Sequence, residues 1–425
     1  MGEQPRAKIG IISMGDMGSA LASILIANGY AVATNCTGRS QDTIDRATNV
    51  GAELLPTDEA LITQCDVVLS VVPPAQAAAT AERIIAAFKN VHVSSPTRSR
   101  STPLYFADMN AIAPSTVRSI AAQFTAAGLD PDRDVRFVDG CILGGPPSRK
   151  QQQQSVTGGS GSTNLGPSAT GPAALITSSS SSSSSPASTS STKPTTASFP
   201  QEDILHDPTT GWSCPLLPTS GPWSFTDTST FPYPYGQHFA EVLHIEHILP
   251  NPDPADADSS SLTATAAEQK QTSEIGQASA LKNVYAALAK GFAALSLLSL
   301  STASSLRILP SFLSSLERLA PSRLQTMTRY VTTLPPKAYR WVREMEEISK
   351  TFTDEEEVGW DKEGEDVFKM VAGVFKFVAD ETVLGEEKVG KRKRGLDLED
   401  LCEALGDGLE ERRKRRRGEM ERVEK

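Results

Sequence analysis

Short runs of apolar residues alternate with longer stretches of mixed polarity along the first third of the chain. The runs predict buried strands and lie at residues 8–12, 31–34, 67–72, 91–93 and 137–142. The stretches between them have the apolar spacing of helices. Because strands that alternate with helices form parallel sheets, we expect an α/β Rossmann-type, doubly wound domain over residues 1–147.

This pattern is lost after residue 147 and returns only in part. Residues 148–210 are rich in Gln, Ser, Thr, Gly and Pro and include an unbroken serine run at 178–185. Such a segment cannot bury enough apolar area to offset its ordering entropy, so we expect a disordered insert. Residues 211–250 regain a foldable composition and are expected to complete the Rossmann-type domain, whereas 251–273 should be a second, flexible and acidic insert.

The remaining residues have helical patterns, and 274–390 are expected to form an all-α domain. Its first helix, at 275–300, is apolar nearly all round, so we expect it to be buried. Further helices are expected at 311–319, 339–352 and 367–383, with breaks at Pro310, at Pro335 and Pro336, and at Gly359. Residues 391–425 mix basic and acidic clusters and are expected to be a charged, solvated tail.

The first strand runs directly into a glycine-containing turn and the start of a helix. The turn residues are expected to line the pyrophosphate of a dinucleotide and are Ser13, Met14, Gly15, Asp16, Met17 and Gly18. Gly15 lets the backbone approach a phosphate closely, and Gly18 lets the helix pack tightly on the strand. The helix N-terminus offers unpaired N–H groups to the anion. Ser13 replaces the first glycine of the usual G-x-G-x-x-G pattern, but the following strand lies at βαβ spacing and supports the interpretation.

The residues after the second strand bear on cofactor choice. Sites for NAD usually have Asp or Glu there to bind the ribose hydroxyls, whereas this chain has Gly38, Arg39 and Ser40. A cation and a hydroxyl suit a 2′-phosphate, and a charge-assisted contact of that kind contributes roughly 1.5–3 kcal/mol. We therefore expect NADP in preference to NAD; the alternative is that Arg39 is a surface residue of a turn.

Composition limits the possible partners. The formal net charge of −10 argues against nucleic-acid binding by the bulk of the protein. The five cysteines are widely spaced with no C-x-x-C pair, as in a reduced intracellular protein without a cysteine-based zinc site. No apolar run is as long as a membrane span and no signal-peptide pattern occurs, so we expect a cytoplasmic protein that binds no membrane.

Two further clusters have ordinary explanations. His238, His244 and His247 are close in sequence, but on a strand-like segment their side chains would lie on opposite faces, so we expect no metal site. The basic runs at 391–394 and 412–417 are expected to be solvated helix surface, with a nuclear import signal as the alternative.

Seven segments in this order resemble the β-hydroxyacid dehydrogenase superfamily, which includes 6-phosphogluconate dehydrogenase. They read GIISMGDMGSALA, GRSQDTIDRA, DVVLSVVPP, YFADMNAIAPSTVRSIA, FVDGCILGGPP, EIGQASALKNVYAALAKGF and PPKAYRWVREMEEI. The closest resemblance is to a fungal branch described as 6-phosphogluconate dehydrogenase C-terminal domain-like proteins. This resemblance implies a Rossmann-type domain followed by an all-helical domain, with the active site in the cleft between them and the helical domains paired in a homodimer.

The resemblance also assigns roles to residues of this chain. It implies that Val72, Pro73 and Pro74 cover the nicotinamide ribose and that Asn110 lies in the loop region facing the nicotinamide. Gly144 and Gly145 would belong to the loop that binds the substrate carboxylate.

The catalytic lysine of the family corresponds to Lys282. Oxidation of an alcohol requires a base for the hydroxyl proton, and a cleft lysine with a lowered pKa can accept that proton and return it. Asn283 and Tyr285 are polar neighbours on the same helix, and Tyr285 could replace a missing hydrogen-bond donor. The alternative is that Lys282 extends to solvent.

The chain departs from the family at two positions that bind a carboxylate substrate. The Ser of the family's Ser-Gly-Gly is Leu143 here, and the Asn four residues after the lysine is Ala286. Two function classes therefore stay open. The first is an NADP-dependent oxidoreductase acting on CH–OH, with a small hydroxyacid, carbonyl or imine as substrate; the second is an NADP-binding sensor or scaffold with little or no catalysis.

Overall fold

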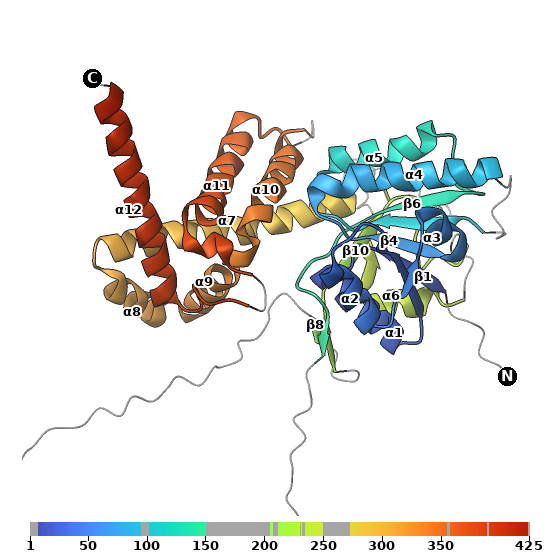
Figure 1. Ribbon diagram of the computed structural model, residues 1–425, viewed down its shortest axis with the longest axis horizontal. Coiled ribbons are helices and arrows are strands. Elements are labelled where there is room, and N and C mark those ends of the chain that lie inside the picture. The colour runs from blue at the N-terminus through green and yellow to red at the C-terminus, as the bar shows by residue number, and fades with distance from the viewer. Residues whose placement is uncertain are drawn as a thin grey trace, which may run out of the picture. The chain divides into compact units, whose positions relative to one another are not determined.

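The computed structural model describes residues 7–94, 102–149, 205–206, 211–229, 231, 234–249, 273–354, 358–388 and 391–423. Most of the expected insert at 148–210 and nearly all of that at 251–273 lie outside the described residues. The described part contains the expected Rossmann-type α/β fold followed by a helical domain (Figure 1).

One eight-stranded sheet forms the centre of the first domain, in the order β11-β10-β6-β5-β4-β1-β2-β3. Its strands are β1 Lys8–Ile12, β2 Ala31–Asn35, β3 Glu53–Leu55, β4 Val67–Ser70, β5 Leu104–Asp108, β6 Val135–Gly140, β10 Leu217–Ser220 and β11 Ile245–His247. All neighbouring pairs are parallel except β10 with β6. The segment at 211–250 therefore adds two strands to the same sheet, as the composition predicts.

Helices cover both faces of this sheet, and alternate strand residues divide between two cores. Ile9 and Ile11 of β1 pack in one core with α1 Asp16–Ala27, α2 Gln41–Asn49 and α6 Gly236–Leu243. Ile12 packs in the other core, and its helices are α3 Asp58–Gln64, α4 Ala77–Ser94 and α5 Pro114–Ala126. Figure 1 shows α4 and α5 on one side of the sheet and α1 and α6 on the other.

Short elements connect these parts. The one-turn helix η1 Pro74–Gln76 follows β4, and a small three-stranded sheet has the order β7-β9-β8. Its strands are β7 Ser148–Arg149, β8 Leu205–His206 and β9 Trp212–Cys214.

The prediction of a strand at 91–93 is wrong, because these residues belong to the last turns of α4. Ile84, Ile85 and Phe88 set a helical spacing of buried residues that continues to Val91 at the core edge. Two valines separated by one residue are too few to override a helix already formed.

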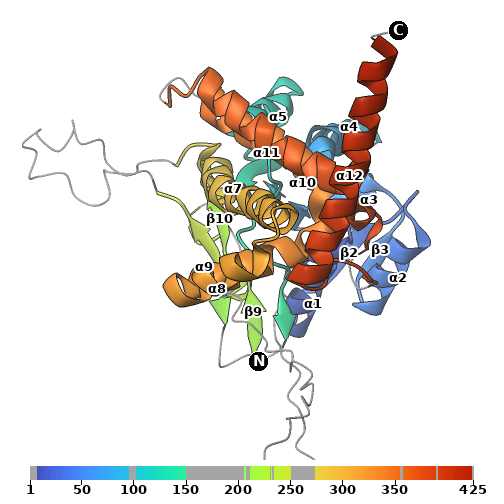
Figure 2. The same cartoon turned by 90° about the vertical axis from the view of Figure 1, so that its left-hand side faces the viewer.

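The second domain consists of helices arranged around α7 Gln277–Ser305. The others are α8 Leu309–Leu319, α9 Pro321–Thr333, α10 Ala338–Thr353, α11 Lys362–Glu381 and α12 Leu398–Val423, with one-turn helices η3 Pro335–Lys337 and η4 Val383–Glu386. Figure 2 shows α7 beside α10 and α11, with which it is in contact. Helix α9 was not predicted, and Pro310 lies in the first turn of α8 rather than at a break.

Two predictions about this domain are corrected. The α7 helix is not buried all round: the side chains of Leu288, Leu295 and Leu298 are 77%, 64% and 49% exposed. The segment after residue 391 is not wholly a solvated tail, because Leu401 and Leu405 of α12 are buried in the core of the helical domain. Most of the basic residues in the later turns of α12 are exposed, whereas Arg412 is half-buried and pairs with Glu381 of α11.

By length and apolar composition α7 is able to cross a membrane, and among the described helices of at least 18 residues it alone meets that test. It carries two lysines, Lys282 and Lys290, and its buried residues pack against α9, α10, α11 and α12. Within this structure it is the central helix of a packed domain.

Candidate functional site

The turn between β1 and α1 has the features of a phosphate-binding turn. Ser13 has a positive φ of 81°, and Gly15 precedes the helix without any side chain capping the first N–H groups of α1. A Cβ on Gly18 would lie 2.0 Å from the carbonyl oxygen of Ser13, so only glycine fits there. The uncapped helix N-terminus is suited to an anion such as a pyrophosphate.

Arg46 of α2 supports this turn, a role that the sequence did not reveal. Its Nε donates a hydrogen bond of 2.9 Å to the carbonyl oxygen of Met14, whose side chain is fully buried. Helix α1 begins at Asp16, so Asp16, Met17 and Gly18 of the predicted turn form its first turn. An arginine two helices away gives no local sequence signal for such a contact.

The residues after β2 lie at the surface. Gly38 has a positive φ of 73°, Arg39 is exposed, and Ser40 precedes α2 with its Oγ 3.1 Å from the Oγ1 of Thr43. Within the described residues the Arg39 guanidinium has no ion pair or hydrogen bond. The side chain is thus available for a ligand.

Residues 72–74 follow β4, and Asn110 holds their start in place. The Oδ1 of Asn110 accepts a hydrogen bond of 2.7 Å from the Val72 amide, and its Nδ2 donates to the Oγ of Ser70 at 3.1 Å. Asn110 is 2% exposed. Its side-chain amide therefore positions Val72, directly after β4, and the expectation that Asn110 lies in the loop region facing the nicotinamide stays a prediction.

Lys282 of α7 lies beside the loop that follows β6. Its Nζ donates a hydrogen bond of 2.6 Å to the carbonyl oxygen of Ile142, immediately before the Leu143, Gly144 and Gly145 loop. The side chain is half-buried, and burial, followed by the charge of Lys290, lowers its pKa below the usual value for a lysine. The structure thus brings Lys282 and the predicted substrate loop together.

Asp139, at the end of β6, fixes the first turn of α7 and so the position of Lys282. Its carboxylate accepts hydrogen bonds from the Gly276 amide at 2.8 Å, the Ser279 Oγ at 2.7 Å and the Ser220 Oγ at 2.7 Å. A carboxylate at a helix N-terminus also interacts favourably with the helix dipole. The sequence analysis did not identify this residue.

Asn283 and Tyr285 of α7 differ in burial and in the residues around them. Asn283 is 1% exposed, and its Nδ2 donates to the carbonyl of Ile112 and the Oγ1 of Thr351, so it ties α7 to the loop between β5 and α5 and to α10. Tyr285 is 38% exposed and lines a shallow groove between α7 and α9 with Phe292. The expectation that Tyr285 replaces the hydrogen-bond donor missing at Ala286 stays a prediction.

A group of charged side chains from α7 and α10 lies near Lys282. Lys290 and Glu344 form an ion pair of 2.6 Å that is largely out of solvent, and the Lys290 ammonium is 5.5 Å from the Trp341 ring centre. Burial raises the pKa of Glu344, but Lys290 and Arg340 outweigh it and the pKa is lowered. The Glu344 carboxyl group therefore keeps its negative charge at neutral pH.

Lys337 is a candidate that the sequence analysis missed. It is half-buried in η3, and within the described residues its ammonium has no hydrogen bond or ion pair. Burial and the charge of Arg340 lower its pKa, while Asp16 of the glycine turn opposes this. Lys337 therefore lies within electrostatic range of the turn. A lysine just before a helix, where the dipole disfavours cations, is the signal that could have identified it.

The first domain is tied to α10 by two carboxylates. The Glu347 Oε2 accepts hydrogen bonds from the Ala113 amide at 3.0 Å and the Thr116 Oγ1 at 2.8 Å, and so caps α5. Asp354 accepts one from the Ser115 Oγ at 2.9 Å.

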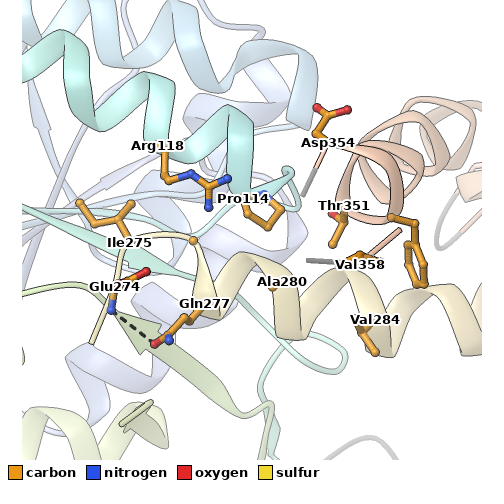
Figure 3. Close-up of a pocket in the computed structure, with 12 residues that line it drawn as sticks. Pro114, Arg118, Glu274, Ile275, Gln277, Ala280, Val284, Thr351, Asp354 and Val358 are labelled. Atoms are coloured by element: carbon orange, nitrogen blue, oxygen red, sulfur yellow. Dashed lines mark hydrogen bonds between the residues drawn. The ribbon is translucent and has the colours of Figure 1, made fainter. Parts of the chain in front are cut away.

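An open pocket of about 600 Å³ lies beside these contacts and away from Lys282. Figure 3 shows its lining from α5, the start of α7 and the end of α10, including Pro114, Arg118, Gln277, Ala280, Thr351 and Asp354. The glycine turn and Lys282 do not line it, so this pocket is separate from the candidate site.

The histidines do not gather into a metal site. His238 hydrogen-bonds the Tyr30 hydroxyl at 2.8 Å, and His247 hydrogen-bonds the Thr219 hydroxyl at 3.1 Å. No cluster of three potential metal ligands occurs among the residues the structure describes.

Two family models match parts of the chain. Residues 8–97 match the family "NADP oxidoreductase coenzyme F420-dependent", and residues 303–378 match a domain of unknown function, DUF1932. No curated protein matches the chain. These matches agree with an NADP-oxidoreductase type of first domain. Neither model names the fungal 6-phosphogluconate dehydrogenase-like branch, which stays a prediction.

Solved structures with a similar chain include a 3-hydroxyisobutyrate dehydrogenase from Mycobacterium tuberculosis, with 12% identity, 94% of this chain and 99% of that chain covered, and a TM-score of 0.47. An imine reductase from Myxococcus stipitatus in complex with NADP+ has 13% identity, coverages of 94% and 99%, and a TM-score of 0.39. A reductive aminase from Aspergillus terreus has 16% identity, coverages of 93% and 98%, and a TM-score of 0.38. At these sequence identities and TM-scores, the similarity to these structures says nothing about the reaction of this protein.

Proposed function

We propose that the protein is an NADP-dependent oxidoreductase that acts on a small hydroxyacid, carbonyl or imine, with Lys282 as the proton donor and acceptor. The observation that carries this proposal is the half-buried Lys282 ammonium, of lowered pKa, bound to the Ile142 carbonyl beside the Gly144 and Gly145 loop. The match of residues 8–97 to an NADP oxidoreductase family supports the cofactor class.

The turn residues fit a dinucleotide. The uncapped N-terminus of α1 would hold the pyrophosphate, the close approach at Gly18 leaves its backbone clear, and the exposed Arg39 would meet a 2′-phosphate. When bound, the nicotinamide supplies or accepts the hydride.

Lys282 moves the proton of the reaction. In the reduction direction its ammonium donates a proton to the substrate oxygen or nitrogen, and in the oxidation direction its neutral amine removes that proton. Asp139 binds the first turn of α7 to the sheet and so fixes the position of Lys282. The Ile142 carbonyl orients the ammonium until substrate replaces that contact.

Lys337 and Arg340 are proposed to hold an anionic group of cofactor or substrate. Lys337 is half-buried without a partner in the described part of the chain, and burying an unpaired ammonium is costly unless an anion joins it. Lys337→Met should therefore weaken NADPH binding if the anion is the pyrophosphate, or raise KM for substrate alone if it is a substrate carboxylate.

The first test is nucleotide binding followed by turnover. We expect calorimetry to give tighter binding of NADPH than of NADH, with the preference reduced about tenfold or more in Arg39→Ala. Arg318→Ala, an exposed arginine of α8, serves as the control. No binding of either nucleotide would overturn the proposal.

Turnover with a panel of hydroxyacids, aldehydes and cyclic imines then tests the chemistry. Loss of turnover in Lys282→Met, with NADPH binding retained and the exposed Lys376→Met unaffected, would support the role of Lys282.

A sensor or scaffold is the second candidate, and one observation favours it. Leu143 and Ala286 offer no hydrogen bond to a carboxylate, and Asn283 is committed to packing. Tight NADPH binding without turnover on any panel member would favour this candidate.

A further inference from the structure

Asp108, at the carboxyl end of β5, is a buried carboxyl group with an unsatisfied oxygen. It is 1% exposed, and its Oδ2 has no hydrogen-bond partner in the described part of the chain. Its Oδ1 accepts one hydrogen bond of 3.0 Å, from the backbone N–H group of Asn110. A buried carboxylate normally gathers several donors, so this environment is poor for a negative charge.

A second carboxyl group lies on the neighbouring strand. Asp108 and Asp139 are register partners of the parallel pair β5 and β6, whose strands are about 4.8 Å apart. Asp139 takes the available donors: Ser220 from β10, and Ser279 and the Gly276 amide from α7. The unequal sharing of donors favours the proton on Asp108.

Asp108 also begins a chain of contacts that reaches the proposed cofactor site. It holds the Asn110 backbone, and the Asn110 side chain in turn holds the Val72 amide and the Ser70 hydroxyl. Ser70 is in register with Asp108 on the adjacent strand β4. Asp108 and Asn110 therefore together position the start of residues 72–74.

We propose that Asp108 is a positioning residue that is held as a neutral carboxylic acid and, through Asn110, fixes residues 72–74 of the proposed cofactor site. Loss of its proton would place a negative charge beside Asp139, whose own pKa is raised by burial, with no donor to receive it. The segment around Asn110 would then have to shift or admit water, and Val72 would lose its anchor. Burial, aided by Asp139, raises the pKa of Asp108 to about 7, which puts this change in the physiological range.

Thermal unfolding without nucleotide tests the inference independently of the proposed function. Since the folded state holds the Asp108 proton more tightly than the unfolded chain, this group favours folding less and less as the pH rises from about 4 to 7. Asp108→Asn has nearly the same shape and cannot ionise. We expect the Tm of Asp108→Asn minus that of wild type to increase by roughly 5 °C between pH 5 and pH 8. A difference that does not change with pH would overturn the inference.

The wild-type protein supplies a second measurement in case Asp108→Asn does not fold. Infrared difference spectra should lose one protonated-carboxyl carbonyl band between pH 6 and pH 8.5. Persistence of every such band, or the absence of any at pH 6, would overturn the inference.

The effect on the cofactor site is read from NADPH affinity, and this arm alone rests on the proposed function. The ratio of the wild-type Kd to the Asp108→Asn Kd should rise several-fold from pH 6 to pH 8.5, because titration of NADPH itself cancels in the ratio. A constant ratio would contradict the link to residues 72–74, whereas failure of both proteins to bind NADPH would contradict the proposed function and leave the unfolding and infrared results to decide on Asp108.

Discussion

Lys282 differs from a surface lysine because it is half-buried and its hydrogen bond is to a carbonyl oxygen rather than to a carboxylate. A carbonyl stabilises the ammonium less than a carboxylate does, so burial dominates and the pKa is lowered from 10.5. The rate of oxidation should therefore rise with pH through a midpoint below 10.5, because the neutral amine is the base. The rate of reduction should fall over the same interval. Parallel pH profiles in both directions would contradict this role for Lys282.

Two glycines three positions apart in the turn should respond differently to alanine. A Cβ on Gly18 would collide with the Ser13 carbonyl at 2.0 Å, whereas the nearest atom to a Cβ on Gly15 is 3.8 Å away. Gly18→Ala should lower the free energy of unfolding by about 2–4 kcal/mol. Gly15→Ala should leave it within about 0.5 kcal/mol but weaken NADPH binding, because the methyl group would occupy the space for the pyrophosphate. Chemical denaturation and calorimetry on both variants distinguish the two effects, and equal losses of stability would contradict them.

Single residues also mark the limit of sequence reasoning at the site. The glycine turn and Arg39 were predicted because each lies in a local pattern, and Lys282 because it matches the catalytic lysine of the family that the chain resembles. Arg46 and Asp139 bind residues distant in sequence, and the Asn110 side chain binds the Val72 amide directly after β4. Such contacts depend on which strands become neighbours, and one sequence does not specify that.

At the scale of elements, Glu347 of α10 caps α5 in the other domain. Burial raises the pKa of Glu347, but the Ala113 amide, Lys350 and Thr116 outweigh burial and lower it below 4.5. A carboxyl group with a lowered folded pKa stabilises the protein above its unfolded pKa, and this contribution is lost as the pH falls. Glu347→Gln should therefore lower the free energy of unfolding by roughly 1–3 kcal/mol at pH 7 and by much less near pH 4. Urea denaturation at both pH values measures this, with Glu346→Gln as an exposed control.

Helices and strands whose apolar residues recur at regular spacing were predicted well, whereas short or polar elements were not. The strands β1, β2, β4 and β6 and the helices α7, α8, α10 and α11 match predicted segments to within a few residues. Helix α9 was missed because its polar and threonine-rich sequence has little apolar periodicity, and the core packing of α12 was missed because charged residues outnumber the few leucines that pack it. In both cases tertiary packing outweighs composition.

At the scale of the whole molecule, the exposed leucines of α7 indicate a surface that another chain could cover. We propose a homodimer through this face, because isolated apolar side chains are common on monomers but a row along one helix is not. The double variant Leu288→Glu with Leu295→Glu should be a monomer by light scattering at a concentration where the wild type is a dimer. Met370→Glu on α11, also exposed, is the control. A monomeric wild type, or a dimeric double variant, would contradict the prediction.

The α7 helix also joins the two domains mechanically. Its 29 residues make a rod of about 43 Å, with the first turn bound to Asp139 at the sheet and the later turns in the core of the helical domain. A tilt of about 5° at the first turn would displace the far end by about 4 Å. A small rotation at the edge of the sheet where Lys282 lies would therefore be magnified at the distant leucines if α7 moved as a rigid rod, and a displacement of the leucines would rotate the first turn by a small angle.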